Sequence, residues 1–202
     1  MQSKALPIIA VVKKEEKEAK LKAFIAAHLA RTISDKTQHA VSDRVVLLIA
    51  RSHESPVVHA LASAVAEGGD TPFSLKALIL VPEASPESAW PAELAASISC
   101  RTIPDLRMLD AHEQLWLDSE TVWIGDCMRR EPGKRDAYEC YADGCTTTAQ
   151  FVETAFNRLW DKGQPSHVET GKSAASASET LDPHLAQIAP ADTSAPTAAT
   201  RH

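Results

Sequence analysis

The chain has 202 residues, 44% of them hydrophobic, which is enough for one domain with a hydrophobic core plus an appendage. Its net charge of −6 is spread without a long run of one sign, so overall charge does not favour nucleic-acid binding, although a local basic patch stays open. The apolar stretch at residues 7–12 is too short for a signal sequence, and no stretch reaches the roughly 18 apolar residues of a membrane span. We therefore expect a cytoplasmic protein without a membrane partner.

The first half of the chain predicts a β-α-β unit behind an N-terminal helix. Residues 13–33 place apolar side chains at three- and four-residue intervals, as an amphipathic helix does. Residues 44–50 are a continuous apolar run, typical of a strand buried on both faces, and residues 75–81 repeat this pattern. A helix at residues 57–66 separates the two strands, so they should be parallel with a right-handed crossover.

The second half predicts shorter elements and one long helix. Residues 146–162 are predicted to form a strongly amphipathic helix with Phe151 on its apolar face. The threonines at residues 146–148 are able to cap this helix. The shorter elements are a helix at 91–97, a strand at 100–103, two strands at 112–118 and 120–125 joined by a tight turn, and an edge strand at 135–141.

The composition changes after residue 162. Residues 163–202 are rich in Ala, Ser, Thr and Pro and have too few large apolar residues to offset the entropy of ordering, so they are expected to form a disordered tail. Residues 1–39 are expected to be a helical segment packed on the domain, and residues 40–162 the domain itself. The predicted fold class is α/β, a mixed sheet with flanking helices.

A motif in the predicted strand pair resembles a known family. The stretch His112-Glu-Gln-Leu-Trp-Leu-Asp-Ser-Glu-Thr-Val-Trp-Ile-Gly-Asp-Cys-Met128 is similar to the phospholipase D-like superfamily's H-x-K-x-x-x-x-D followed by G-S-x-N. The resemblance implies a half-domain of that superfamily over residues 40–162. In the family, the His attacks phosphorus, the Lys stabilises the phosphoryl oxygens and a carboxylate supports the His. Two such motifs, from two halves or a dimer, must meet.

The motif is degenerate here. Aligned from its C-terminal end, it keeps the Asp and Gly slots and loses the other four, which fall on Ala111 (His slot), Glu113 (Lys slot), Asp126 (Ser slot) and Met128 (Asn slot). A one-residue bulge would bring His112 into the His slot, but Gln114 would then occupy the Lys slot. A neutral amide cannot replace a cation at a transferring phosphoryl group.

A basic cluster follows the second strand of the motif. Its members are Arg129, Arg130, Lys134 and Arg135, around a Pro-Gly turn. Arg side chains match phosphate geometry, so these four residues are candidates for binding an anion. Glu131 and Asp136 lie among them and would pair with them if the segment is an ordinary solvated turn.

Two functions of different class follow. The first is a non-catalytic phospholipase D-like module that acts in binding or assembly, pairing with itself as a homodimer or with another protein. The alternative is a dimeric phosphodiesterase or nuclease that uses a shifted His112 together with Asp118. We expect no cofactor and no metal, because the four cysteines form no C-x-x-C pair and no nucleotide-binding or zinc-protease motif occurs.

Overall fold

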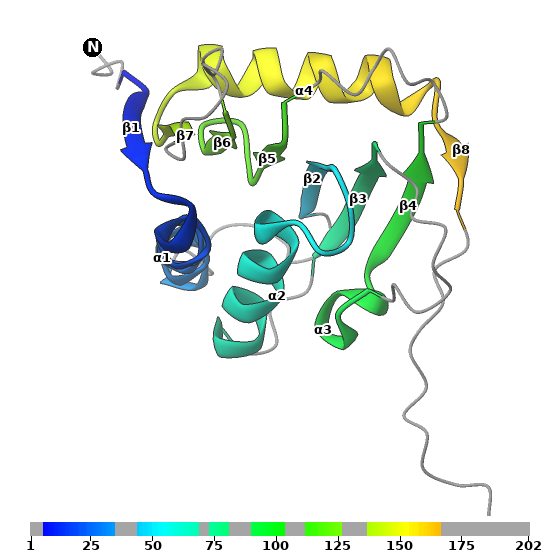
Figure 1. Ribbon diagram of the computed structural model, residues 1–202, viewed down its shortest axis with the longest axis horizontal. Coiled ribbons are helices and arrows are strands. Elements are labelled where there is room, and N and C mark those ends of the chain that lie inside the picture. Colours follow the sequence, from blue (N-terminus) through cyan, green and yellow to red (C-terminus); the bar gives the residue numbers. More distant parts are fainter. Residues whose placement is uncertain are drawn as a thin grey trace, which may run out of the picture. The chain divides into compact units, whose positions relative to one another are not determined.

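The computed structural model describes residues 6–34, 44–68, 73–80, 90–103, 112–126 and 137–166. Four helices are present in this part of the chain: α1 (Lys14–Ser34), α2 (Pro56–Gly68), α3 (Ala92–Ala95) and α4 (Thr146–Trp160). The strands are β1 (Ile8–Val12), β2 (Val45–Ala50), β3 (Ser74–Ile79), β4 (Ile98–Thr102), β5 (Gln114–Trp116), β6 (Val122–Ile124), β7 (Ala137–Ala142) and β8 (Gln164–Pro165). They form one sheet in the order β1-β7-β6-β5-β2-β3-β4-β8 (Figure 1).

The sheet is mixed, as predicted. Strand β2 pairs in parallel with β3, and β3 with β4, so the predicted β-α-β unit through α2 is confirmed. The other pairs are antiparallel, including the predicted hairpin of β5 and β6, in which Leu115 lies opposite Trp123. The parallel half and the antiparallel half of the sheet meet where β2 pairs with β5.

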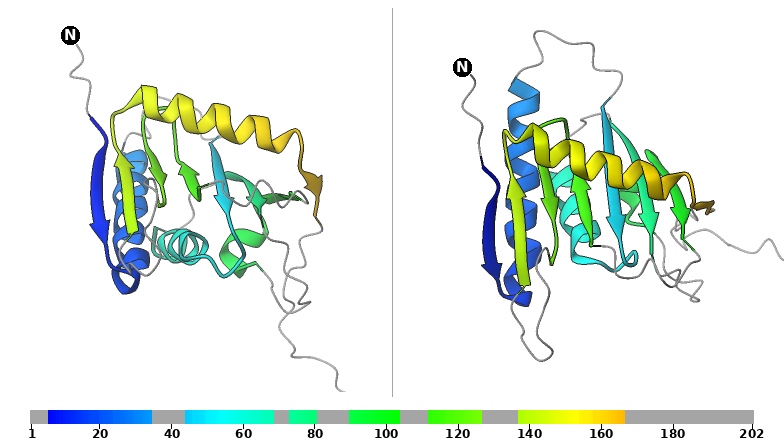
Figure 2. Two further views of the ribbon diagram at one scale, coloured as in Figure 1. Left: turned by 45° about the horizontal axis from the view of Figure 1, so that its top comes forward. Right: turned by 90° about the horizontal axis from the view of Figure 1, so that it is seen from above.

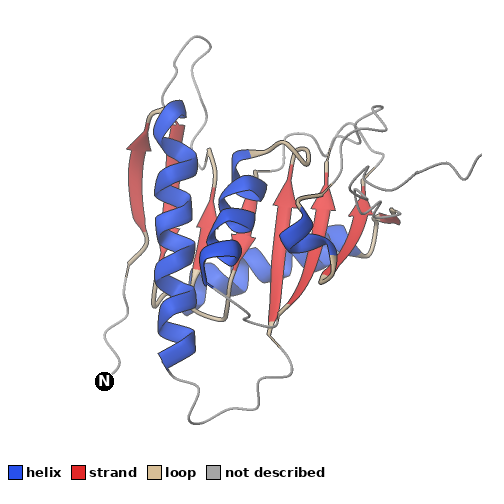
Figure 3. Ribbon diagram, turned by 90° about the horizontal axis from the view of Figure 1, so that it is seen from below, coloured by secondary structure: helices blue, strands red, loops and turns tan. Residues whose placement is uncertain are grey.

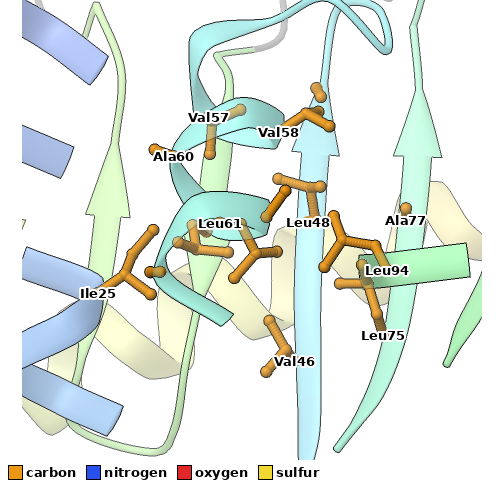
Figure 4. Packing of buried hydrophobic residues seen from close by; sticks show 14 of the residues in the cluster. Ile25, Val46, Leu48, Val57, Val58, Ala60, Leu61, Leu75, Ala77 and Leu94 are labelled. Carbon is orange, nitrogen blue, oxygen red and sulfur yellow. The ribbon is translucent and has the colours of Figure 1, made fainter. Parts of the chain in front are cut away.

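Helices cover both faces of the sheet. In Figures 1 and 3, α1, α2 and α3 lie on one face, and α4 crosses the other. Strand β2 shows why its sequence is apolar throughout: Leu48 packs with α1 and α2 (Figure 4), whereas Leu47 and Ile49 pack with Phe156 of α4. A strand buried on both faces has no position at which a polar side chain would reach water.

Helix α4 differs from the prediction in two details. Its N-terminal cap is Cys145 rather than a threonine, and the Cys145 Sγ atom is hydrogen-bonded to the hydroxyl of Thr148 in the first turn, at 3.1 Å. Phe151, predicted on the apolar face, is 64% exposed, because the side chains that the helix buries are Ala149, Val152 and Phe156. A 15-residue helix on one side of a sheet buries a narrower stripe than its apolar residues alone suggest.

The N-terminal apolar stretch forms an additional strand. Residues 8–12 pair antiparallel with β7 as strand β1, with Ile9 opposite Cys140. The prediction that residues 135–141 form an edge strand is therefore wrong, since β7 lies between β1 and β6. Helix α1, which follows β1, contributes Leu21 and Ile25 to the same core cluster as α2 and β2. Residues 8–34 thus share one sheet and one core with the elements after residue 44.

At the opposite edge of the sheet, the first residues of the predicted tail belong to the fold. Gln164 and Pro165 form strand β8, which pairs antiparallel with β4, so the segment from residue 163 begins as part of the sheet. Residues 167–202, the rest of the predicted tail, lie outside the described residues. No helix in the described part of the chain is long and apolar enough to cross a membrane.

Candidate functional site: a buried ion cluster at the motif-like hairpin

The described part of the motif-like stretch, residues 112–126, contains the hairpin of β5 and β6, close to the middle of the sheet. The open end of the hairpin is held by the Gly125 amide, which donates to the Glu113 carbonyl oxygen at 2.9 Å. At the closed end, one carboxylate oxygen of Asp118 accepts hydrogen bonds from the amides of Glu120 and Thr121, at 2.8 and 2.6 Å. The retained Asp of the motif therefore shapes the turn, as Asp commonly does in tight turns.

Glu113, which occupies the Lys slot, is buried and paired. Its side chain is 10% exposed, and its carboxylate lies 3.5 Å from the ammonium of Lys17 on α1. It also accepts a hydrogen bond from the Arg51 amide at 3.2 Å, from the end of β2. In the alignment predicted from the sequence, Glu113 stands where the family has its lysine, and the positive charge beside it comes from Lys17 on α1.

The same ammonium contacts a second carboxylate. Glu139 on β7 has a fully buried side chain, and its carboxylate lies 3.2 Å from the nitrogen of Lys17. We call Lys17, Glu113 and Glu139 the ion cluster. Charged side chains are rarely buried without a partner, and here one cation serves two anions. When both carboxylates are ionised, the ion cluster therefore has two negative charges and one positive charge.

An indole forms the wall beside the ion cluster. The Lys17 nitrogen lies 5.1 Å from the centroid of the Trp123 ring, within the range of a cation–π interaction. Trp123 also explains the glycine of the motif: a Cβ atom on Gly125 would come within 2.6 Å of the indole and 3.4 Å of the Lys17 nitrogen. Only glycine leaves room for the ring and the ammonium at this point.

Burial raises the pKa of the Glu139 carboxyl above its ordinary value, and the nearby Asp126 charge raises it further, although Lys17 opposes both effects. Asp126, which stands in the Ser slot, adopts a left-handed backbone conformation with φ of 49°, which aspartate tolerates better than most residues. Negative groups therefore prevail among the described side chains at this end of the hairpin. Such a site attracts protons or cations and repels oxyanions.

His112 lies in the segment that leads into β5, with an exposed side chain. The β5–β6 pairs run one to one from Gln114 opposite Ile124 to Trp116 opposite Val122, without a bulge in these pairs. Gln114 is buried, and its side-chain oxygen has no hydrogen-bond partner among the described residues. This alignment suits the assignment of Glu113, rather than Gln114, to the Lys slot.

His112 and Asp118 are not brought together within one chain. They lie at opposite ends of β5, six residues apart, which corresponds to roughly 20 Å along a strand. The free carboxylate oxygen of Asp118 lies 3.6 Å from the imidazole of His28 on α1. Burial lowers the pKa of His28, and the Asp118 charge partly offsets this shift. Asp118 thus serves the contact between the hairpin and α1.

A small cavity of about 30 Å³ lies between α1, α2 and β2. Leu29, Leu61 and Phe73 make its walls largely apolar, and Arg44, whose guanidinium donates to the Thr32 carbonyl oxygen at 3.1 Å, lies beside it. A volume of this size holds about two water molecules. It does not accommodate a substrate of the size of a phosphodiester.

The four basic candidates Arg129, Arg130, Lys134 and Arg135 lie in residues 127–136, outside the described residues, as does Ala111. Their role in anion binding stays a prediction. Among the residues that the structure describes, no group of three or more His, Cys, Asp and Glu side chains is arranged to hold a metal ion.

Sequence reasoning missed Lys17 and Glu139. One signal was present for Lys17, because it continues the four-residue spacing of the buried Leu21 and Ile25 on the inner face of α1. A lysine on such a stripe has to find an anion inside the protein. Glu139 offered a similar signal as the one acidic residue within strand β7. The pairing of the two with Glu113 could not be predicted, because it depends on how distant segments pack.

No protein-family model and no curated protein sequence matches the chain. Solved structures do. Nuc from Salmonella typhimurium, a phospholipase D family member, is 15% identical with a TM-score of 0.51, over 80% of this chain and 99% of Nuc. TrmBL2, an archaeal chromatin protein described with a novel mode of DNA binding, is 13% identical with a TM-score of 0.51, over 79% of this chain and 55% of its own. NucT from Helicobacter pylori is 10% identical, with a TM-score of 0.49, over 80% of this chain and 99% of NucT.

The similarity to Nuc extends over nearly the whole of that protein. The chain therefore has the phospholipase D-like fold, and the fold predicted from the degenerate motif is confirmed. At 15% identity the similarity establishes the fold alone, and the same fold serves different functions in different proteins. What this chain does has to be argued from its own hairpin.

Proposed function

We propose that the chain is a non-catalytic phospholipase D-like module that acts in binding or assembly. The observation that carries this proposal is the buried carboxylate of Glu113 in the slot where the motif requires a lysine. A transferring phosphoryl group develops negative charge on its oxygens, and catalysis depends on fixed positive groups aimed at that charge. A carboxylate in this position raises the energy of the charged transition state.

Lys17 does not replace the missing lysine. Its side chain is 10% exposed, and its ammonium already contacts the carboxylates of Glu113 and Glu139. To stabilise a phosphoryl oxygen it would have to leave these two anions, and two buried carboxylates would then face each other without a cation. The cost of an uncompensated buried charge is several kcal/mol, on the order of the stability of the whole domain. The ammonium therefore stays in the ion cluster.

The alternative function is a dimeric phosphodiesterase that uses His112. One observation favours it: the His112 side chain is exposed, so it could meet a second copy or a substrate. Against it, Asp118 lies at the far end of β5 and is engaged with turn amides and His28. A second copy would have to supply both the missing cation and the supporting carboxylate. The described residues favour the non-catalytic function.

Assembly with protein is favoured over binding to nucleic acid. TrmBL2 shares the fold and is described with DNA binding. In this chain, however, the net charge is −6, and carboxylates prevail among the described side chains at the motif end of the hairpin. Nucleic-acid binding relies on cations that neutralise backbone phosphates. A protein partner, including a second copy of the chain, needs no such cations.

Hydrolysis of bis-p-nitrophenyl phosphate tests the proposal. Wild-type protein and His112→Ala, both shown to be folded by circular dichroism, are assayed side by side with an active phosphodiesterase as the positive control. The proposal predicts release of p-nitrophenol at the rate of buffer alone in both samples. Turnover by the wild type that disappears in His112→Ala would overturn it and establish the alternative.

A further inference from the structure

Large exposed hydrophobic side chains gather at one edge of the sheet. Of the five such side chains among the described residues, four lie within six consecutive positions, and the fifth is Phe151 on α4. The four, with their exposed fractions, are Leu6 (81%), Ile8 (68%), Ile9 (57%) and Val11 (56%). Single exposed hydrophobic residues are ordinary on protein surfaces, but a cluster of this kind marks a surface that binds another molecule.

These side chains lie on and next to strand β1, which is the last strand at its end of the sheet (Figure 2). We call residues 6–12 the β1 edge. Strand β1 pairs with β7 on one side, and no described strand pairs with its other side. Proteins usually protect an edge strand with charges, a proline or a covering element, and an uncovered apolar edge pairs readily with another chain. Residues 8–12 contain neither a charge nor a proline.

A strand that pairs with β1 should be apolar on both faces. Successive side chains of a strand point to opposite faces, so Ile9 and Val11 share one face, and Ile8 and Val12 lie on the other. All four side chains are apolar; Ile8, Ile9 and Val11 are exposed, whereas Val12 is fully buried. Strand β1 itself, with the sequence Ile-Ile-Ala-Val-Val, has the property that its partner needs.

We propose that the β1 edge pairs antiparallel with the β1 edge of a second copy of this chain. A two-fold axis at Ala10 places Ile9 opposite the second copy's Val11, and Ile8 opposite its Val12. In such a symmetric pair the two strands are identical, so a charge within one strand would lie near the same charge of the other strand and the two would repel each other. The β1 edge carries none, and Lys13, directly after it, falls opposite Pro7.

The size of the β1 edge indicates a weak dimer. A stable interface uses about 20–30 residues from each partner, whereas this edge offers the side chains of residues 6–12 and the backbone of one strand. The dimer should therefore dissociate on dilution within a measurable range. This inference rests on the proposed assembly function and specifies its partner, and it does not depend on whether the protein hydrolyses phosphodiesters.

Sedimentation velocity over increasing protein concentration tests the inference. The wild type should shift from monomer to dimer, and Ile9→Lys/Val11→Lys should stay monomeric because each pairing then faces like charges. Both substituted side chains are more than half exposed, so the variant should keep the melting temperature of the wild type. The matched control is Phe151→Lys, which changes the one exposed large hydrophobic residue that the described part of the chain has outside the β1 edge, and it should dimerise like the wild type.

A cysteine at the proposed axis tests the register. Ala10→Cys would lie opposite its own copy with a Cα separation of about 4.5–5.5 Å, within disulfide range. Mild oxidation should therefore give a covalent dimer on non-reducing gels, which wild type and the α4 control Thr154→Cys should not give. A wild type that stays monomeric, or a dimer that survives Ile9→Lys/Val11→Lys, would overturn the inference. Phosphodiester hydrolysis, measured on the same samples, tests the proposed function separately.

Discussion

Glu139 is a fully buried charged side chain, and its environment works against its ionisation. Its carboxylate shares the Lys17 ammonium with Glu113, and burial together with Asp126 raises its pKa above the ordinary value of 4.5. The folded chain therefore holds the Glu139 proton to a higher pH than the unfolded chain does. Between the two pKa values the folded state binds more protons, so the free energy of unfolding falls as the pH rises.

Replacing Glu139 by Gln isolates this effect. Because Gln does not ionise, the free energy of unfolding of Glu139→Gln minus that of the wild type should increase as the pH rises above 4.5, and it should level off once the pH has passed the raised pKa of Glu139 in the folded protein. Urea unfolding at several pH values measures this difference. His28, whose pKa is lowered by burial, destabilises both proteins below pH 6.5 and cancels in the difference.

The control for this experiment is Glu93→Gln, at an exposed position of α3. Its difference from the wild type gives the baseline for a Glu-to-Gln exchange at the surface over the same pH range. A Glu139→Gln difference that does not rise above this baseline would mean that the Glu139 carboxyl ionises as easily in the folded protein as in the unfolded chain. The description of the ion cluster would then be wrong.

At the scale of elements, the ion cluster links α1 to the sheet. Lys17 comes from α1, Glu113 from the residue before β5 and Glu139 from β7. Replacing Lys17 by Met keeps the length of the side chain and removes the cation, which leaves two buried carboxylates near each other. The expected loss is about 3–5 kcal/mol in the free energy of unfolding, measured in urea at pH 7.

A second variant separates charge from packing. Lys17→Met combined with Glu113→Gln and Glu139→Gln removes all three charges and should recover most of the stability, because replacing a whole buried ion cluster is often neutral. Lys20→Met, on the exposed side of α1 in a pair with Glu16 that is about half exposed, should change stability by less than about 1 kcal/mol. A loss equally large in the triple variant would show that packing, rather than charge, explains the Lys17 effect.

The elements that sequence predicts well are those whose pattern is local. The apolar runs of β2 and β3 and the periodicity of α2 and α4 are complete within each segment, so their positions agree with the structure. Strand β1 was missed because five apolar residues become a strand only through pairing with β7, about 130 residues later. Strand β8 was missed for the same reason, since its partner β4 lies far from it in the sequence.

The same reasoning applies to the candidate site. The motif-like stretch predicted the hairpin of β5 and β6, because a hairpin depends on spacing along one segment. That the hairpin lacks the family's lysine rests on the same spacing and stays a prediction. The ion cluster joins positions 17, 113 and 139, and spacing contains no information about such a contact. A charged residue on an otherwise apolar stripe, as Lys17 is, was the available indication that a buried partner existed.

At the scale of the whole molecule, a phospholipase D-like fold contains a hairpin with a buried carboxylate, that of Glu113, at its open end. The two edge strands of the sheet differ in length and composition. Strand β8 at one end has two residues, whereas the β1 edge at the other end is apolar and longer. An apolar edge strand without a described strand on its outer side agrees with the proposed function in assembly.

The most direct test of the central claim is whether the hairpin binds a phosphoryl oxyanion. Inorganic phosphate, titrated into ¹⁵N-labelled wild-type protein at pH 7, should cause no saturable shift of the Glu113 and Gly125 amide signals, because the carboxylates beside them repel the anion. Saturable shifts of these two amides that disappear in His112→Ala would contradict the claim and show that the hairpin still forms a phosphate site.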